Sequence, residues 1–168
     1  MIVHGPLAAM HVAAALTALA SGLSVVLGRK GTALHRLIGL VYVFAMLLTN
    51  ISALTIYHLT GHFGLFHAFA LLSLFSTIIG LALPVLRLRN WLDGHVQWMS
   101  WSYLGLVAAS LNEILVRLPL QVNTPARIFA AGAGLAVCVA IAGLGLRPRL
   151  KRAVLKVAAL KPETGANV

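Results

Sequence analysis

Seven histidines and one glutamate within an apolar segment are the residues of this chain whose types and spacing could do chemistry. Neutral imidazole is the commonest metal ligand in proteins, and a carboxylate often completes such a site. A polar group inside a membrane span is also costly enough to suggest a function by default. The sequence contains neither a Gly-rich phosphate loop nor a GxSxG nucleophile elbow. The pattern therefore favours metal or cofactor binding over hydrolysis.

Five long apolar segments must position these residues. The chain of 168 residues is 60% hydrophobic and only 10% charged, whereas about 25% of the residues in soluble domains are charged. A helix needs about 20 apolar residues to cross a bilayer. We therefore predict an all-α, polytopic membrane protein, a five-helix bundle within residues 1–146, followed by a basic cytoplasmic tail over residues 147–168. The predicted spans cover residues 7–27, 34–57, 65–86, 95–116 and 128–146.

The basic residues predict how the bundle lies in the membrane. Eleven of the thirteen fall in the first turn, the third turn and the tail. They are Arg29, Lys30, Arg36, Arg87, Arg89 and six residues of the tail. Because cytoplasmic segments carry an excess of Lys and Arg, we expect the amino terminus outside and the carboxyl terminus inside. The net charge of +10 then reflects topology and attraction of the tail to anionic lipid headgroups, and we expect no nucleic-acid partner.

Glycines and small residues predict where the first two helices end and touch. Gly28 should end the first helix, and Thr32 should cap the second. Ala14, Ala18 and Gly22 recur every four residues. Such a ridge of small residues lets a neighbouring helix approach closely.

The predicted topology sorts the histidines into two layers. Toward the outer face we expect His4, His11, His58, His62, His67 and Glu113. At the inner face, His35 and His95 begin the second and fourth spans. Helix geometry puts His95 and Glu113, which are 18 residues apart, on one stripe about 27 Å long. Ser102, Gly105 and Ala109 should line that stripe and face the bundle.

One interpretation of the layers is haem b held by pairs of histidines. The pairs would be His11 with His67 near the outer face and His35 with His95 near the inner, since facing helices build the cofactor sites of bundles. This layout resembles that of membrane cytochromes of the b561 type. A separation of about 27 to 33 Å between the layers is, however, long for electron transfer between two haems.

A second interpretation is a metal ion, Zn, Cu or Fe, in the outer layer. His58 and His62 have the spacing of one helical turn, although Gly61 between them favours a loop. Glu113, with His11 or His67, would complete the ligands. We also expect His11, His67 and Glu113 to face one another across the bundle. In a third interpretation the histidines simply lie at the membrane interface, where an amphipathic ring is stable.

Two short blocks carry a family resemblance. They consist of His35, Arg36, Gly39, Tyr42 and Met46, and of the segment 95–99 with the residues that follow it. These blocks resemble the signature of a bacterial family of predicted membrane proteins, domain of unknown function 2306. The resemblance implies a multi-pass protein of the bacterial inner membrane but no activity. Two functions stay open: a histidine-based redox or metal site, or a non-catalytic structural or assembly subunit, with a membrane-protein partner or a homo-oligomer.

Overall fold

Four antiparallel helices make up the part of the chain that the computed structural model describes, residues 5–55, 65–117 and 152. They are α1 (Pro6–Leu27), α2 (Ala33–Thr55), α3 (Leu65–Val85) and α4 (Trp91–Arg117). Within these residues no strand occurs, so the predicted all-α fold is confirmed there. The predicted fifth span, the loop with His58 and His62, and the tail apart from Arg152 lie outside the described residues.

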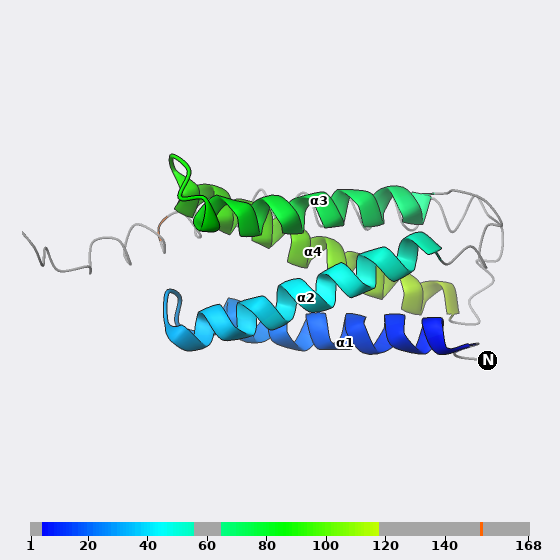
Figure 1. Cartoon of the computed structure of the whole chain (residues 1–168). Coiled ribbons are helices and arrows are strands. Elements are labelled where there is room, and N and C mark those ends of the chain that lie inside the picture. The colour runs from blue at the N-terminus through cyan, green and yellow to red at the C-terminus, as the bar shows by residue number, and fades with distance from the viewer. Residues whose placement is uncertain (1–4, 56–64, 118–151, 153–168) are drawn as a thin grey trace, which may run out of the picture.

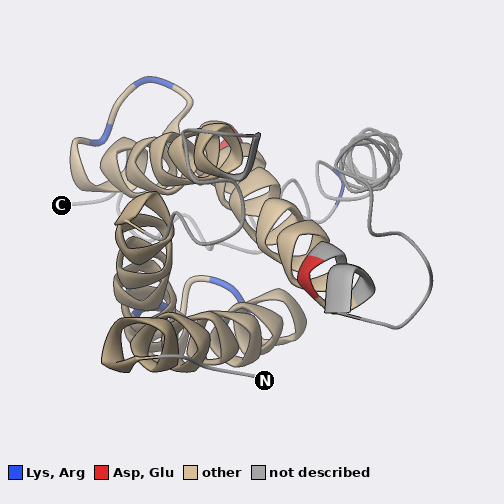
Figure 2. Cartoon of the chain, turned by 90° about the vertical axis from the view of Figure 1, so that its right-hand side faces the viewer, with Lys and Arg blue, Asp and Glu red and all other residues tan. Residues whose placement is uncertain are grey.

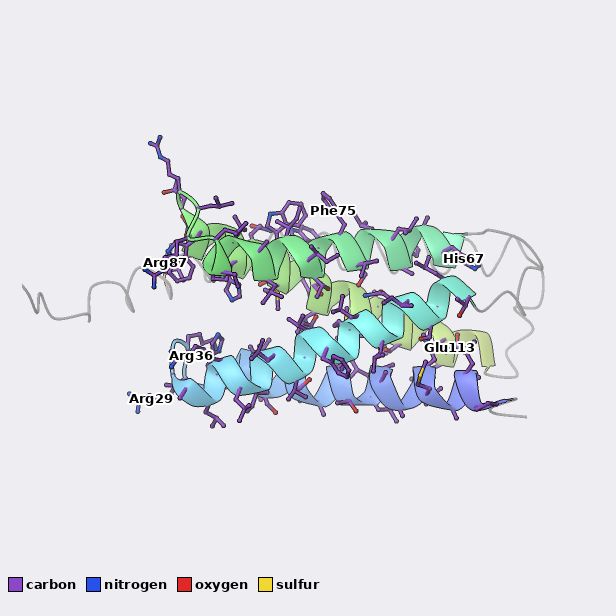
Figure 3. All side chains as sticks on the ribbon, in the orientation of Figure 1. Arg29, Arg36, His67, Phe75, Arg87 and Glu113 are labelled. Carbon is purple, nitrogen blue, oxygen red and sulfur yellow. The ribbon has the colours of Figure 1, made fainter. Side chains whose placement is uncertain are left out.

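The helices lie side by side, and the chain reverses after each one (Figure 1). α1 packs on α2 and α3 on α4, while contacts of α2 with α3 and of α1 with α4 close the bundle. The bundle therefore has two chemically different ends. Arg29, Arg36 and Arg87 lie at one end and His67 and Glu113 at the other (Figure 3). We call them the basic end and the distal end.

Lys and Arg gather in the turns that join α1 to α2 and α3 to α4 (Figure 2). Both turns lie at the basic end, so α1 and α3 run toward that end and α2 and α4 run away from it. α2 and α4 are consequently parallel to each other, and this direction matters for the site described below.

Three described helices are long and apolar enough to cross a membrane: Pro6–Leu27, Ala33–Thr55 and His67–Val85. Their outward side chains fit this environment. Leu16, Phe44 and Leu72 are 61%, 65% and 60% exposed, which is unfavourable in water but not against lipid. The chain is thus a helical membrane protein in contact with the bilayer. α4 packs against α3 and, with fewer contacts, against α1, and its crossing of the membrane stays a prediction.

The predicted caps of the first turn are confirmed. α1 ends at Leu27, and the amide of Gly28 donates a hydrogen bond to the Ser24 carbonyl oxygen at 2.8 Å. Thr32 caps α2, because its Oγ1 accepts a hydrogen bond from the amide of His35 at 3.0 Å. Gly31 between them has a φ of +78°, in the left-handed region that glycine adopts without strain.

The second basic turn makes α4 start earlier than predicted. Asn90, with a φ of +57°, reverses the chain, and the helix begins at Trp91 rather than at His95. Asp93 lies in its first turn, where a negative side chain complements the helix dipole. His95 is therefore held one turn inside a regular helix.

The predicted small-residue ridge of α1 is confirmed as a packing face. Ala14, Ala18 and Gly22 are all buried, and Ala18 is part of the core formed with Tyr42 and Met46 of α2. Gly22 leaves the room that the ring of Tyr103 occupies, since a Cβ there would lie 2.4 Å from two ring carbons. The ridge thus brings α1 close to α2 and α4 together.

Candidate functional site

A chain of hydroxyl groups joins three helices in the middle of the bundle. Oγ of Ser102 lies 2.8 Å from the Tyr42 hydroxyl and 2.7 Å from Oγ1 of Thr77. Thr77 donates its single hydroxyl proton to the Ser73 carbonyl at 2.9 Å. Ser102 must therefore donate to Thr77, and Tyr42 to Ser102. All three hydroxyls are buried and satisfied, which is how polar groups between membrane helices are accommodated.

This hydroxyl chain also shows which residues of α2 and α4 face each other. The two helices are parallel, and Tyr42 opposes Ser102. A residue seven positions, or two turns, closer to the basic end lies on nearly the same face of its helix. On α2 this step leads to His35, and on α4 it leads to His95. The two histidines therefore lie at one depth on parallel helices, about 10 Å from the Tyr42–Ser102 pair by helix rise.

His95 is held by the neighbouring helix α3. Its Nδ1 lies 2.6 Å from the carbonyl oxygen of Gly80. Because a carbonyl only accepts, Nδ1 carries the proton, and in the neutral ring Nε2 keeps its lone pair. A histidine that binds a metal usually donates its other N–H to a carbonyl or carboxylate in this way. The ring of His95 thus has the tautomer and the support of a ligand.

His35 lies close enough to His95 for their charged forms to interact, and it also interacts with Lys30 and Arg36. Its Nδ1 is buried and has no hydrogen-bond partner among residues 5–55 and 65–117. Beside this ring is a cavity of about 270 Å³ between α1 and α2. It is lined by Ser24, Val25, Gly28, Arg29, Thr32, Leu34, His35 and Ile38.

His11 forms a polar contact in the distal half. Its Nδ1 lies 2.9 Å from Oγ of Ser52. The Ser52 hydroxyl is 2.6 Å from the Leu48 carbonyl and 3.0 Å from that of Thr49, so its own proton points to a carbonyl. Nδ1 of His11 must therefore donate to Ser52, and Nε2 of the neutral ring accepts. The hydroxyl partner Ser52 was not foreseen from the sequence.

Glu113 interacts electrostatically with His11 across the interface of α1 and α4. His67 is only 3% exposed and lies at the same end of the bundle as Glu113 (Figure 3). In the described part of the chain, however, no three His, Cys, Asp or Glu side chains are close enough together to hold a metal ion. The structure thus places His67 and Glu113 at one end of the bundle, without a three-ligand group among the described residues.

The stripe of α4 differs from the predicted one in its middle. Ser102 and Leu106 are buried, whereas Ala109 is exposed and a Cβ on Gly105 would meet nothing within 4 Å. The buried part of this face therefore holds Ser102 and Leu106, and Glu113 nearer the distal end is only half-buried.

Comparison with known proteins agrees with the resemblance seen in the sequence. A family model described as "Predicted membrane protein (DUF2306)" matches residues 8–146. The match includes both sequence blocks and all five predicted spans, apart from Leu7. No curated protein and no solved structure matches the chain. Because the family model covers most of the sequence, the chain belongs to the DUF2306 family of predicted membrane proteins.

Proposed function

We propose that this protein is a small haem protein of the bacterial inner membrane, in which His35 and His95 ligate haem b at the basic end. The observation that carries the proposal is the shared register of the parallel helices α2 and α4. The hydrogen bond between Tyr42 and Ser102 sets this register, and two turns away both helices carry a histidine. Ligands on facing helices are the usual way in which bundles hold a cofactor.

The hydrogen bonding of the two rings supports this choice. The Gly80 carbonyl orients His95 and leaves Nε2 as the ligating atom. The buried Nδ1 of His35, without a hydrogen bond to any described residue, is a nitrogen for which a ligand would be the natural partner. A bound haem would supply one-electron transfer, and these two residues would hold it.

The charges around His35 favour haem over a bare metal ion. Lys30 and Arg36 interact with the ring and would repel a divalent cation. The same positive charges attract the two carboxylates of haem b. Arg29 lines the cavity of about 270 Å³ beside His35, where its guanidinium could bind a propionate. This volume is slightly below the range of about 300 to 1,000 Å³ typical of ligand pockets, so a porphyrin would occupy it only in part.

We further propose that the basic end faces the cytoplasm, as the excess of Lys and Arg in its turns predicts. With five spans, a reporter fused after Val168 should then be active in the cytoplasm, and a tag inserted at Gly61 should be accessible from outside. The opposite pattern would place the proposed haem at the outer face and would contradict the predicted topology.

Absorption spectroscopy tests the haem directly. The full chain, purified in detergent from cells supplied with a haem precursor, should show a Soret band and α and β bands that sharpen on reduction with dithionite. Elemental analysis should find iron in proportion to haem. Metal without a Soret band would instead support the ion site with His58 and His62. If neither haem nor metal is found, the structural or assembly subunit is the remaining function. The hydroxyl chain of Tyr42, Ser102 and Thr77 would then serve to hold helices together.

A further inference from the structure

We propose that the basic end holds a binding site for one anionic phospholipid, formed by α1, α2 and the turn that joins them. The phosphate lies against the guanidinium of Arg29, and a segment of one acyl chain enters the cavity of about 270 Å³ that Arg29 lines. The site differs from a general attraction of basic residues to acidic headgroups, because it joins positive charge to a space with defined walls. It requires no cofactor, so it goes beyond the proposed function.

The walls of this cavity suit a hydrocarbon chain. Val25 of α1 and Leu34 and Ile38 of α2 line it, and their side chains are wholly apolar. Leu34 is 63% exposed, whereas Val25 and Ile38 are half-buried. The cavity therefore borders the outer surface of the bundle, where lipid lies, rather than its core. Apolar walls gain nothing from a soluble ion but are stabilised by an acyl chain.

Three cations belong to the turn beside the cavity, and the backbone holds two of them. Nζ of Lys30 donates a hydrogen bond to the Gly28 carbonyl at 2.9 Å. Nη1 of Arg36 donates to the Gly31 carbonyl at 3.3 Å. The exposed side chain of Arg29, by contrast, makes no hydrogen bond to any described residue. Its guanidinium is thus available for a phosphate, which it can bind through two parallel N–H groups.

No carboxylate on the neighbouring helices neutralises this turn. Asp93 is the first acidic residue of the chain, so α1, α2 and α3 contain none. Asp93 lies in the first turn of α4, directly after the second basic turn with Arg87 and Arg89. The other described acid, Glu113, lies at the distal end (Figure 3). A lipid phosphate is therefore the counter-charge that the membrane offers, as in the basic pockets between helices that bind acidic headgroups at cytoplasmic faces.

The lipid and the proposed haem have one residue in common. A phosphate and a haem propionate are both anions that Arg29 can bind, so the two ligands compete for its guanidinium. Each ligand has its own signal, because the mass of the bound molecule identifies the lipid and the Soret band identifies haem. Bound lipid without a Soret band would refute the haem and keep the lipid site. A Soret band without selective lipid binding would do the reverse.

Native mass spectrometry of the full chain in detergent tests the site. Phosphatidylglycerol with oleoyl chains should add one tightly bound lipid per chain, and phosphatidylcholine with the same chains should bind more weakly. Arg29→Gln should lower the affinity for phosphatidylglycerol by about fivefold, the effect of one basic residue at an anionic membrane surface. Arg89→Gln is the matched control. It removes the same charge from the second basic turn, and Arg89 does not line the cavity, so the affinity should not change.

Ser24→Leu tests the cavity without a change of charge. Ser24 lines the cavity, and its hydroxyl donates to the carbonyl of Ala20 in its own helix at 2.9 Å, so leucine should keep the fold and fill part of the space. We expect an affinity for phosphatidylglycerol that is lower by about threefold or more, since overpacking an occupied space is costly. Thr17→Leu is the control, because the exposed Thr17 likewise bonds within α1, to Ala13, and lies outside the cavity.

Three results would overturn the site. Equal losses in the Arg29 and Arg89 variants would mean that lipid binding follows net charge alone. Equal affinities of the Ser24 and Thr17 variants would mean that no acyl chain enters the cavity. Equal binding of phosphatidylglycerol and phosphatidylcholine by the wild type would mean that the site does not select an anionic lipid.

Discussion

Gly22→Leu should prevent the bundle from assembling. A Cβ at this position would lie 2.4 Å from Cδ2 and Cε2 of Tyr103 and 3.0 Å from Cε2 of Tyr42. Neither ring can turn away at low cost. Tyr42 is hydrogen-bonded to Ser102 and Tyr103 to the carbonyl of Leu19, and the two rings pack edge to face with centroids 6.2 Å apart. An outward shift of α1 would break the hydrogen bond of Tyr103 to the Leu19 carbonyl.

Overpacking a core typically costs 1 to 3 kcal/mol, and four added carbon atoms against two fixed rings should cost about 3 kcal/mol or more. We expect little monodisperse protein in detergent and a lower midpoint of thermal unfolding by far-ultraviolet circular dichroism. Gly39→Leu is the matched control, because a Cβ on this α2 residue would meet nothing within 4 Å. Equal losses in the two variants would mean that the close approach of α1 to Tyr103 does not hold the bundle together.

His95→Ala should abolish haem binding by the protein as isolated. If the proposed function is correct, this change removes the axial ligand that the Gly80 carbonyl orients. We expect the Soret absorbance per protein to fall by about tenfold or more, since losing one first-shell ligand or its support typically costs 10- to 100-fold in affinity. Imidazole added at millimolar concentration during haem loading should restore part of the band, because it can enter the space left by the side chain.

His11→Ala and His67→Ala distinguish the two ends of the molecule. Both residues belong to the distal end, so both variants should keep the haem of the wild type. Loss of haem in these variants, with full haem in His95→Ala, would move the cofactor to the distal pair and contradict the assignment to α2 and α4. The circular dichroism spectrum of each variant separates loss of ligand from loss of fold.

Local signals in the sequence were sufficient for the described helices and their turns. The apolar segments, the glycine of the first turn and the Thr32 cap each depend on a few neighbouring residues, and the structure agrees with them. The packing ridge of Ala14, Ala18 and Gly22 could also be predicted from the sequence, because four-residue spacing on a helix defines one face. The predicted depths of His11, His35, His67 and His95 depend on the same rules, since depth along a helix is proportional to residue number. His4, His58 and His62 lie outside the described residues.

Only the tertiary structure decided which side chains meet. Periodicity gives the face of a helix but not its rotation or axial shift relative to a helix that is not its neighbour in sequence. The sequence could therefore not show that Tyr42 meets Ser102, and this contact is what aligns His35 with His95. The hydrogen-bond partner of His95 was even harder to predict from the sequence. It is the backbone carbonyl of Gly80, and every residue carries such a carbonyl. Packing of α3 against α4, in which Gly80 leaves space for Met99, brings that particular carbonyl to the ring.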